Sequence, residues 1–160
     1  MTNQQHIAKL HPSIRQNVTN IIKQCDIALS GRSKVKITQS LRTFKEQDDL
    51  YALGRSKQGK KITQAKGGQS IHNYGLALDI CLIIDKKEAS WDMIKDWDND
   101  KVSDWMEVVK IFKSNGFSWG GDWHSFKDNP HFEIPKLEWR RLLDKYKAND
   151  FIPGTTYINL

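Results

Sequence analysis

The clearest pattern of hydrophobic and polar positions lies between residues 75 and 84. Apolar side chains occupy every second position there, which is the repeat of a β-strand with one face against a core. The predicted core face consists of Leu76, Leu78, Ile80, Leu82 and Ile84. The other face carries small side chains around one carboxylate, Asp79. Because an unpaired carboxylate is costly to bury, Asp79 is predicted to bind a partner or a metal.

A repeat of three to four residues indicates helices elsewhere in the chain. The segments with this repeat are residues 7–29, 102–115 and 137–146. Pro12 suits the first turn of a helix that begins there. Thr43 and Glu46 have the spacing of a capping box, which predicts a further helix that runs to Gly54.

Shorter alternating runs predict the remaining strands, at residues 34–38, 117–119 and 131–134, with 151–160 as an added edge strand. Polar stretches at residues 55–69 and 86–101 predict a loop or hairpin and a surface excursion. Because helices and strands do not alternate regularly, the predicted fold class is α+β, with a small central antiparallel sheet flanked by helices.

The chain has 160 residues, of which 38% are hydrophobic, which is enough for one domain with a core, and we expect a single domain over residues 1–160. A net charge of +6 and a pI near 9.3 favour polyanionic partners such as nucleic acid, anionic membrane or an acidic cell wall. The lysines are scattered and no nucleic-acid motif is present, so charge alone does not identify the partner. A nucleic-acid binder would show steeply salt-dependent affinity.

Targeting signals and cysteines narrow the cellular context. No apolar run reaches the roughly 20 residues of a membrane helix, and the N-terminus lacks the pattern of a signal peptide. We therefore expect synthesis in the cytoplasm, no membrane insertion and release by another route. Cys25 and Cys81 are expected to be buried thiols, because two cysteines at this spacing form neither a disulfide framework nor a zinc knuckle.

Two histidines and a carboxylate suggest a metal site. On one continuous strand His72 and Asp79, seven residues apart, would face opposite sides, but residues 73–75 supply a bend that lets His72 turn back toward Asp79. His131 would come from a neighbouring strand. Two imidazoles and one carboxylate are a ligand set of catalytic zinc, whose fourth position is left open. Alone, His72 beside a glycine turn would more simply be structural.

Asp128 is a candidate general base. It precedes His131 by three residues, across a proline turn, and from there it can take the proton of an attacking water without binding the metal. Alone, an aspartate in Asp-Asn-Pro is more simply a turn former.

Three segments together resemble a known enzyme family. They are Ser70-x-His72-x-x-Gly75-x-Ala77-x-Asp79, Trp119-Gly120-Gly121-Asp122-Trp123 with Asp128-x-x-His131-Phe132-Glu133, and Leu41–Tyr51 with Gly54-Arg55. They resemble the zinc peptidases of the D-Ala-D-Ala carboxypeptidase/VanY superfamily, and in particular the L-alanyl-D-glutamate endopeptidases of phages and bacteria. The resemblance covers about residues 35–135 and implies the Hedgehog/DD-peptidase type of fold.

The resemblance implies Zn²⁺ held by His72, Asp79 and His131, with Asp128 as the catalytic base. It also implies that Arg42 binds substrate or stabilises the oxyanion. These roles describe a monomeric hydrolase that cuts the L-Ala–D-Glu bond of peptidoglycan peptide stems at the cell wall, after release through a holin or another route. The alternatives are a D,D-carboxypeptidase or dipeptidase and a non-catalytic zinc- or wall-binding module.

Further residues are expected near the site. Ser70 would be a polar support, and Glu133 would orient a ligand histidine unless it is merely an exposed strand residue. His124 stands where the family carries a basic residue such as lysine, and it would line the cleft or compete as a ligand. Ser40-Leu41 replaces the glycine and tyrosine often found before the arginine. No separate wall-binding domain is expected.

Overall fold

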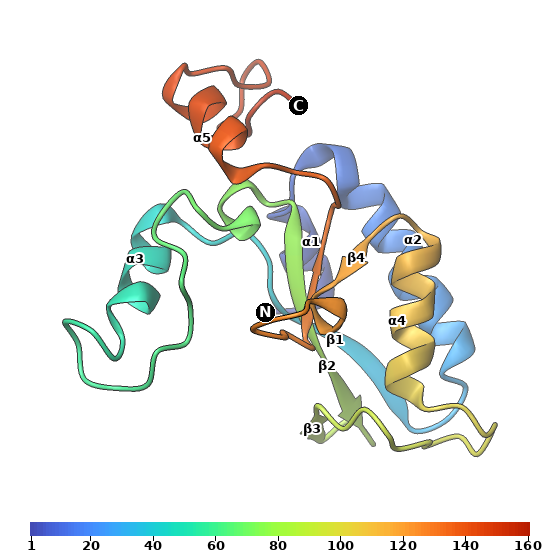
Figure 1. The fold of residues 1–160 in the computed structure, drawn as a ribbon. Helices are drawn as coiled ribbons and strands as arrows, with labels where there is room; N and C mark the ends of the chain where they lie inside the picture. Colours follow the sequence, from blue (N-terminus) through green and yellow to red (C-terminus); the bar gives the residue numbers. More distant parts are fainter.

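Four of the predicted strands pair with one further strand in a single antiparallel sheet (Figure 1). The computed structural model describes all 160 residues, and its strand order is β1-β2-β5-β4, with β3 also paired to β2. The strands are β1 (Ser33–Gln39), β2 (Ala77–Ile84), β3 (Glu88–Ser90), β4 (Ser118–Trp119) and β5 (His131–Glu133). With helices around this sheet, the α+β class is confirmed.

The register of β2 positions the metal candidates. Asp79 lies directly opposite His131 of β5 and opposite Gln39 of β1. The pairing with β1 is irregular between Ile37 and Gln39, at the level of Asp79. Direct cross-strand partners have Cβ atoms about 4.5–5.5 Å apart. The sheet itself therefore brings Asp79 and His131 together.

Five α-helices and two 3₁₀ helices surround the sheet. They are α1 (Asn3–Ala8), α2 (Pro12–Ala28), α3 (Phe44–Ala52), η1 (Ile71–Tyr74), α4 (Asp104–Ser114), η2 (Gly120–Asp122) and α5 (Trp139–Lys147). Figure 1 shows α2 and α4 side by side on one side of the sheet and α3 on the other. The capping box of Thr43 and Glu46 is present at the start of α3, as predicted.

The hydrophobic core fills the space between the sheet and the pair α2 and α4. Phe112 of α4 stacks on Phe132 of β5, with ring centroids 4.2 Å apart. The predicted core face of β2 is buried along its whole length. Ala77 and Cys81 on its other face are buried too, so β2 is a central strand in which Asp79 is one of few partly accessible positions.

Two predictions about elements were wrong. The helices expected within residues 7–29 are present: α2 begins at Pro12 as predicted, and it is preceded by α1, which begins at Asn3 with Thr2 as its cap. The excursion at 86–101 contains the short strand β3. The tail forms no edge strand: Phe151 and Ile158 make one isolated bridge with each other, and the Ile158 carbonyl instead bonds the His11 side chain.

The next features are the length of the helices and the state of the two cysteines. No helix is both long enough and apolar enough to span a bilayer. Both cysteines are free and buried, and burial raises the pKa of Cys25 to about 12. A thiol with such a pKa is inert at neutral pH.

Gly75 is a backbone position on which the site depends. Its φ of 68° lies in the left-handed region, and an added Cβ would lie 2.7 Å from the His11 nitrogen. We expect Gly75→Ala to lower the free energy of unfolding by about 2–5 kcal/mol, as the sum of the left-handed penalty and the clash. Urea unfolding followed by circular dichroism measures it.

Gly116→Ala is the matched control. Gly116 also has a positive φ, 89°, but nothing lies within 4 Å of an added Cβ. Only the conformational penalty of about 1–2 kcal/mol is expected there. An equal loss of unfolding free energy in the two variants would show that the close contact between residue 75 and the His11 backbone does not matter.

Candidate metal centre

His72 is held by the short helix η1 and the turn that follows it. Gly75 ends η1 in the left-handed conformation, and the chain then enters β2, so His72 and Asp79 meet from opposite sides of this bend. The Nδ1–H of His72 donates to the Ser40 carbonyl at 2.8 Å. Ser40 is itself buried and lies 3.1 Å from the His6 ring of α1 through its hydroxyl. His72 is therefore fixed in orientation, and it is only 3% exposed.

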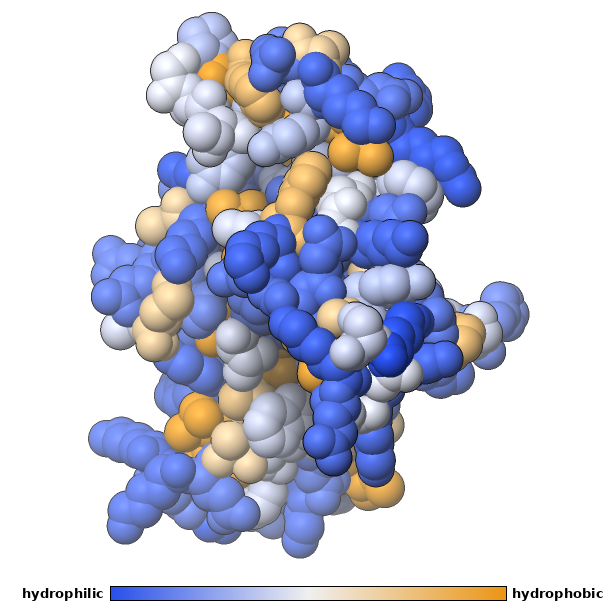
Figure 2. Space-filling model, turned by 90° about the vertical axis from the view of Figure 1, so that its left-hand side faces the viewer, coloured by the Kyte–Doolittle hydropathy of each residue, from blue (hydrophilic) through white to orange (hydrophobic).

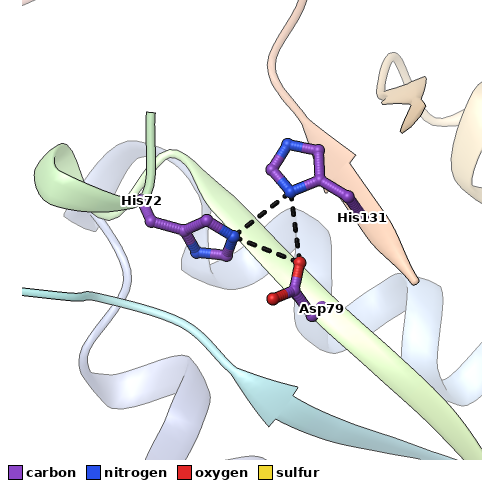
Figure 3. A group of neighbouring side chains, drawn as sticks. All are labelled: His72, Asp79 and His131. Carbon is purple, nitrogen blue, oxygen red and sulfur yellow. Dashed lines mark hydrogen bonds and ion pairs between the residues drawn. The ribbon is translucent and has the colours of Figure 1, made fainter. Parts of the chain in front are cut away.

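Three atoms form a tight triangle at the end of this bend (Figure 3). His72 Nε2 lies 3.1 Å from Asp79 Oδ1 and 3.2 Å from His131 Nδ1, and His131 Nδ1 lies 3.1 Å from the same Asp79 oxygen. Tetrahedral zinc, with bonds of about 2.0–2.1 Å, places neighbouring ligand atoms about 3.3 Å apart. The spacing of the triangle fits one such ion.

The outer hydrogen bonds decide the protonation of the two rings. A backbone carbonyl can only accept, so the Ser40 contact places a hydrogen on Nδ1 of His72 and leaves Nε2 with its lone pair. The Nε2–H of His131 donates to Glu133 at 2.8 Å, so its Nδ1 becomes an acceptor when a metal ion displaces the proton on that nitrogen. Three acceptors thus face one another. A cation satisfies this arrangement, and a hydrogen-bonded acceptor on the far side of the ring is typical of metal-bound histidine.

Charges in the triangle are strongly coupled. Burial alone would raise the pKa of Asp79, but the two imidazoles lower it far below its usual range. Burial alone would lower the pKa of His131, but hydrogen bonds and charges from Asp79 and Glu133 raise it to about 9. The site therefore attracts positive charge, and a metal ion would take the place of the proton on His131.

Arg42 points into the same site from the segment before α3. Its guanidinium lies 3.8 Å from Oδ2 of Asp79, the oxygen outside the triangle. It also donates to Gln47 at 2.9 Å, and Gln47 in turn donates to the Ala65 carbonyl at 2.8 Å. Gln47 is fully buried, so it joins Arg42 to the segment that follows α3. Burial lowers the pKa of Arg42, yet a guanidinium stays charged in proteins.

Asp128 reaches the site on the loop before β5. Its backbone N–H donates to the Gly120 carbonyl, and its own carbonyl accepts from the His131 N–H at 3.1 Å. A Cβ at Gly120 would lie 2.3 Å from the Asp128 carbonyl, so this approach requires glycine. Burial, followed by the charge of Asp79, raises the pKa of Asp128.

These residues line one cleft of about 640 Å³. Trp123 packs beside His131 with ring centroids 5.2 Å apart. The apolar part of the lining includes Ile62, Trp123, Phe126, Leu137 and Trp139. Viewed from the side of α3, the surface of the molecule is mostly hydrophilic, with smaller hydrophobic patches (Figure 2). The size suits a peptide or another small substrate.

The structure brings most of the expected site residues together. The cleft is lined by His72, Asp79, His131, Asp128, Arg42, Ser70 and Glu133. His124 is exposed on the loop and does not line the cleft, so the structure does not bring it to the site.

Sequence reasoning missed the residues that hold the site in shape. These are Ser40, Gln47 and Asn73. Asn73 accepts from the Gly68 N–H and donates to the Arg42 carbonyl, so it joins η1 to two neighbouring segments. Gln47, one helical turn after Thr43, gave a signal, because a polar residue on the inner face of an amphipathic helix needs a partner.

Comparisons with known sequences agree with the geometry. A family model described as D-alanyl-D-alanine carboxypeptidase matches residues 63–134. The peptidoglycan L-alanyl-D-glutamate endopeptidase CwlK of Bacillus subtilis (strain 168) is 50% identical over 127 residues, which cover 78% of this chain and 73% of CwlK. The L-alanyl-D-glutamate peptidase of Listeria phage A118 is 31% identical over 112 residues, or 70% of this chain but 34% of the phage protein.

Solved structures share the fold. The Serratia marcescens L-Ala D-Glu endopeptidase ChiX superposes with a TM-score of 0.57 at 19% identity, over 88% of this chain and 91% of ChiX. The LD-carboxypeptidase LdcB gives a TM-score of 0.52 at 16% identity, over 93% of this chain and 80% of that chain. These two structures show the fold. The similarity to CwlK, with the match of the family model, shows that the chain belongs to the D-alanyl-D-alanine carboxypeptidase family of peptidases, in the branch that contains the peptidoglycan L-alanyl-D-glutamate endopeptidases.

Proposed function

We propose that the protein hydrolyses the L-Ala–D-Glu bond in the peptide stems of peptidoglycan, with zinc held by His72, Asp79 and His131. The observation that carries the proposal is the triangle of three acceptor atoms, each within 3.2 Å of the others, at the floor of a peptide-sized cleft. The identity of half of the aligned residues to CwlK supports the choice of bond.

The chain's own residues prepare the metal site. Ser40 and Glu133 hold the two imidazoles so that their lone pairs face Asp79. A zinc ion bound there would lower the pKa of a water molecule and polarise the scissile carbonyl. A fourth position remains for water or substrate, since three protein ligands are the usual set of a catalytic zinc site.

Asp128 is proposed as the proton carrier. It lines the cleft with the triangle but lies outside the metal-binding group. In that place it takes a proton from the attacking water and delivers it to the leaving amine. A carboxylate suits both steps, because the group that accepts the proton as a base can return it as an acid.

Arg42 is proposed to hold a negative charge of the substrate or of the tetrahedral oxyanion. Its guanidinium is mostly buried and lies in the cleft, where a charged donor is stronger than in water. Gln47 fixes one side of the guanidinium, which leaves other N–H groups free for substrate.

The proposed substrate places the action of the protein at the cell wall. We propose that it acts there as a monomer, without nucleic acid, after release from the cytoplasm through a holin or another route. The wall is anionic, and the net charge of +6 favours attraction to it.

Cleavage of defined muropeptides tests the choice of bond. We expect mass spectrometry to find free stem peptides that begin at D-Glu, and a chelator to abolish their formation. Release of terminal D-Ala without cleavage after L-Ala would instead assign a D,D-carboxypeptidase, the activity for which the matching family model is named. No cleavage of any substrate by the zinc-loaded protein would favour a binding module.

Asp128→Asn tests the base. We expect kcat/KM to fall by about 10²–10⁴-fold, because general acid–base catalysis contributes that much, while the zinc content stays at that of the wild type. Asp122→Asn is the control, since Asp122 ends η2 just before the loop that carries Asp128, is exposed and pairs with Lys113. Unchanged hydrolysis in Asp128→Asn would remove Asp128 from this role.

Glu133→Ala tests the support of His131. Loss of an acceptor that orients a metal-bound histidine costs about 10–100-fold in metal affinity, so we expect that loss in a competition titration against a chromogenic chelator. Glu138→Ala is the matched control, because Glu138 is exposed and makes no side-chain bond. Equal affinities of the two variants for zinc would argue against the role of Glu133.

A further inference from the structure

A second group of carboxylates lies in the segment before α4 and in the first turn of that helix, outside the lining of the peptidase cleft. Residues 96–107 read Asp-Trp-Asp-Asn-Asp-Lys-Val-Ser-Asp-Trp-Met-Glu. Acidic residues stand at positions 1, 3, 5, 9 and 12 of this stretch. These are side-chain ligand positions of the twelve-residue calcium loop of EF-hands, in which position 7 contributes its backbone carbonyl and position 12 a bidentate glutamate.

The fold brings these carboxylates together in two groups that share one residue. Oxygens of Asp96, Asp98 and Asp104 lie within 4.8 Å of one another, and so do oxygens of Asp98, Asp100 and Glu107. Asp98 belongs to both groups. Two oxygens that bind the same Ca²⁺ at 2.3–2.6 Å are at most about 5 Å apart, so the separations are compatible with a shared ion.

Two acceptors at the site have no partner in the protein. Oε2 of Glu107 exposes less than 1 Å² and accepts no hydrogen bond, although it belongs to the carboxylate that meets Asp98 and Asp100. The carbonyl of Val102, at position 7, also accepts no hydrogen bond from the protein; Val102 is exposed, so this oxygen is open to water or an ion. A buried carboxylate oxygen without a partner is costly, because it loses its water and gains nothing in return.

No cation of the protein compensates this charge. None of the five carboxylates forms a salt bridge with lysine, arginine or histidine. Asp104 is fully buried, and its oxygens accept only from the Ser33 hydroxyl and the Trp97 N–H. A buried negative group of this kind calls for a bound cation.

We propose that residues 96–107 form a calcium site, with the carboxylates of Asp96, Asp98, Asp100, Asp104 and Glu107 and the Val102 carbonyl as ligands. All the donors are oxygens, which favours Ca²⁺ over zinc, and a flexible loop with many carboxylates favours it over Mg²⁺. Lys101 occupies position 6, where EF-hands carry glycine, and its φ of 79° is the conformation that glycine would take.

The site would act on the fold rather than on the reaction. None of its residues lines the peptidase cleft. In Figure 1 the segment leads from β3 into the lower end of α4, while α5 lies at the opposite end of the molecule. Asp104 begins α4 and bonds Ser33, the first residue of β1. Bound Ca²⁺ would therefore fasten the segment before α4 to that helix and, through Asp104, to the sheet.

Calorimetry and thermal unfolding test the site without an activity assay, so the result is independent of the proposed peptidase function. The full chain is dialysed against EGTA, reloaded with one equivalent of zinc, and titrated with CaCl₂. We expect one Ca²⁺ per chain with a Kd below about 1 mM. At one hundred times that Kd, we expect the Tm to rise by about 5–10 °C. MgCl₂ at the same concentration should give less than half of this shift.

Two variants identify the ligands. Glu107→Gln and Asp98→Asn should each weaken Ca²⁺ binding at least tenfold while zinc content and circular dichroism remain those of the wild type. Glu88→Gln, an exposed residue of β3, should bind within twofold of the wild type. Absence of saturable binding and of a Tm shift in the wild type up to 10 mM CaCl₂ (about ten times the expected upper limit for Kd) would overturn the proposal. So would wild-type affinity in folded samples of both ligand variants.

Discussion

The structure depends on the pairing of Asp79 in β2 with His131 in β5. This register fixes two of the three candidate ligands through backbone hydrogen bonds, so their separation does not rely on flexible side chains. A slip of β5 by one residue would turn His131 to the opposite face of the sheet from Asp79. The aromatic stack of Phe112 on Phe132, the neighbour of His131, packs β5 against α4 and holds that register. The packing of the core and the separation of two candidate ligands are thus set by the same strand pair.

His72 reaches the pair by a different route, and it needs more support. It lies on a 3₁₀ turn, where it depends on Gly75, on the Ser40 carbonyl and on the buried His6 beside Ser40. The buried polar groups of this support have lost their contact with water, and hydrogen bonds within the protein replace it. The site therefore combines a rigid half on the sheet with a half that a polar network positions. Such a network is sensitive to the loss of any member, because a single unpaired polar group costs more than a hydrogen bond gains.

The sequence predicted what periodicity and residue chemistry encode. Local patterns predicted the strand β2, the capping box of α3 and the helix α4. Asp79 was predicted as a site residue because it is a carboxylate among apolar neighbours. Gln47 and Ser40 were missed because their roles depend on segments distant in sequence. The tail was predicted wrongly because an apolar run near a chain end satisfies β propensity and packing on a helix equally well. His124 was named through its chemistry alone, and its position on an exposed loop was not readable from the chain.

The proposed base and the candidate ligands lie on different kinds of backbone, and this fits what each is proposed to do. The ligands lie in or beside the buried sheet, since an ion held by three atoms tolerates little displacement. Asp128 lies on a loop anchored at Gly120 and by the bond from the Trp119 side chain to the Asn129 carbonyl. A group that accepts a proton from water and later returns it to an amine must serve two atoms at different positions. A short loop that is fixed at both sides lets the carboxylate shift between the water and the amine while it stays in the cleft. In β5, the backbone pairing would hold the same carboxylate in a single direction.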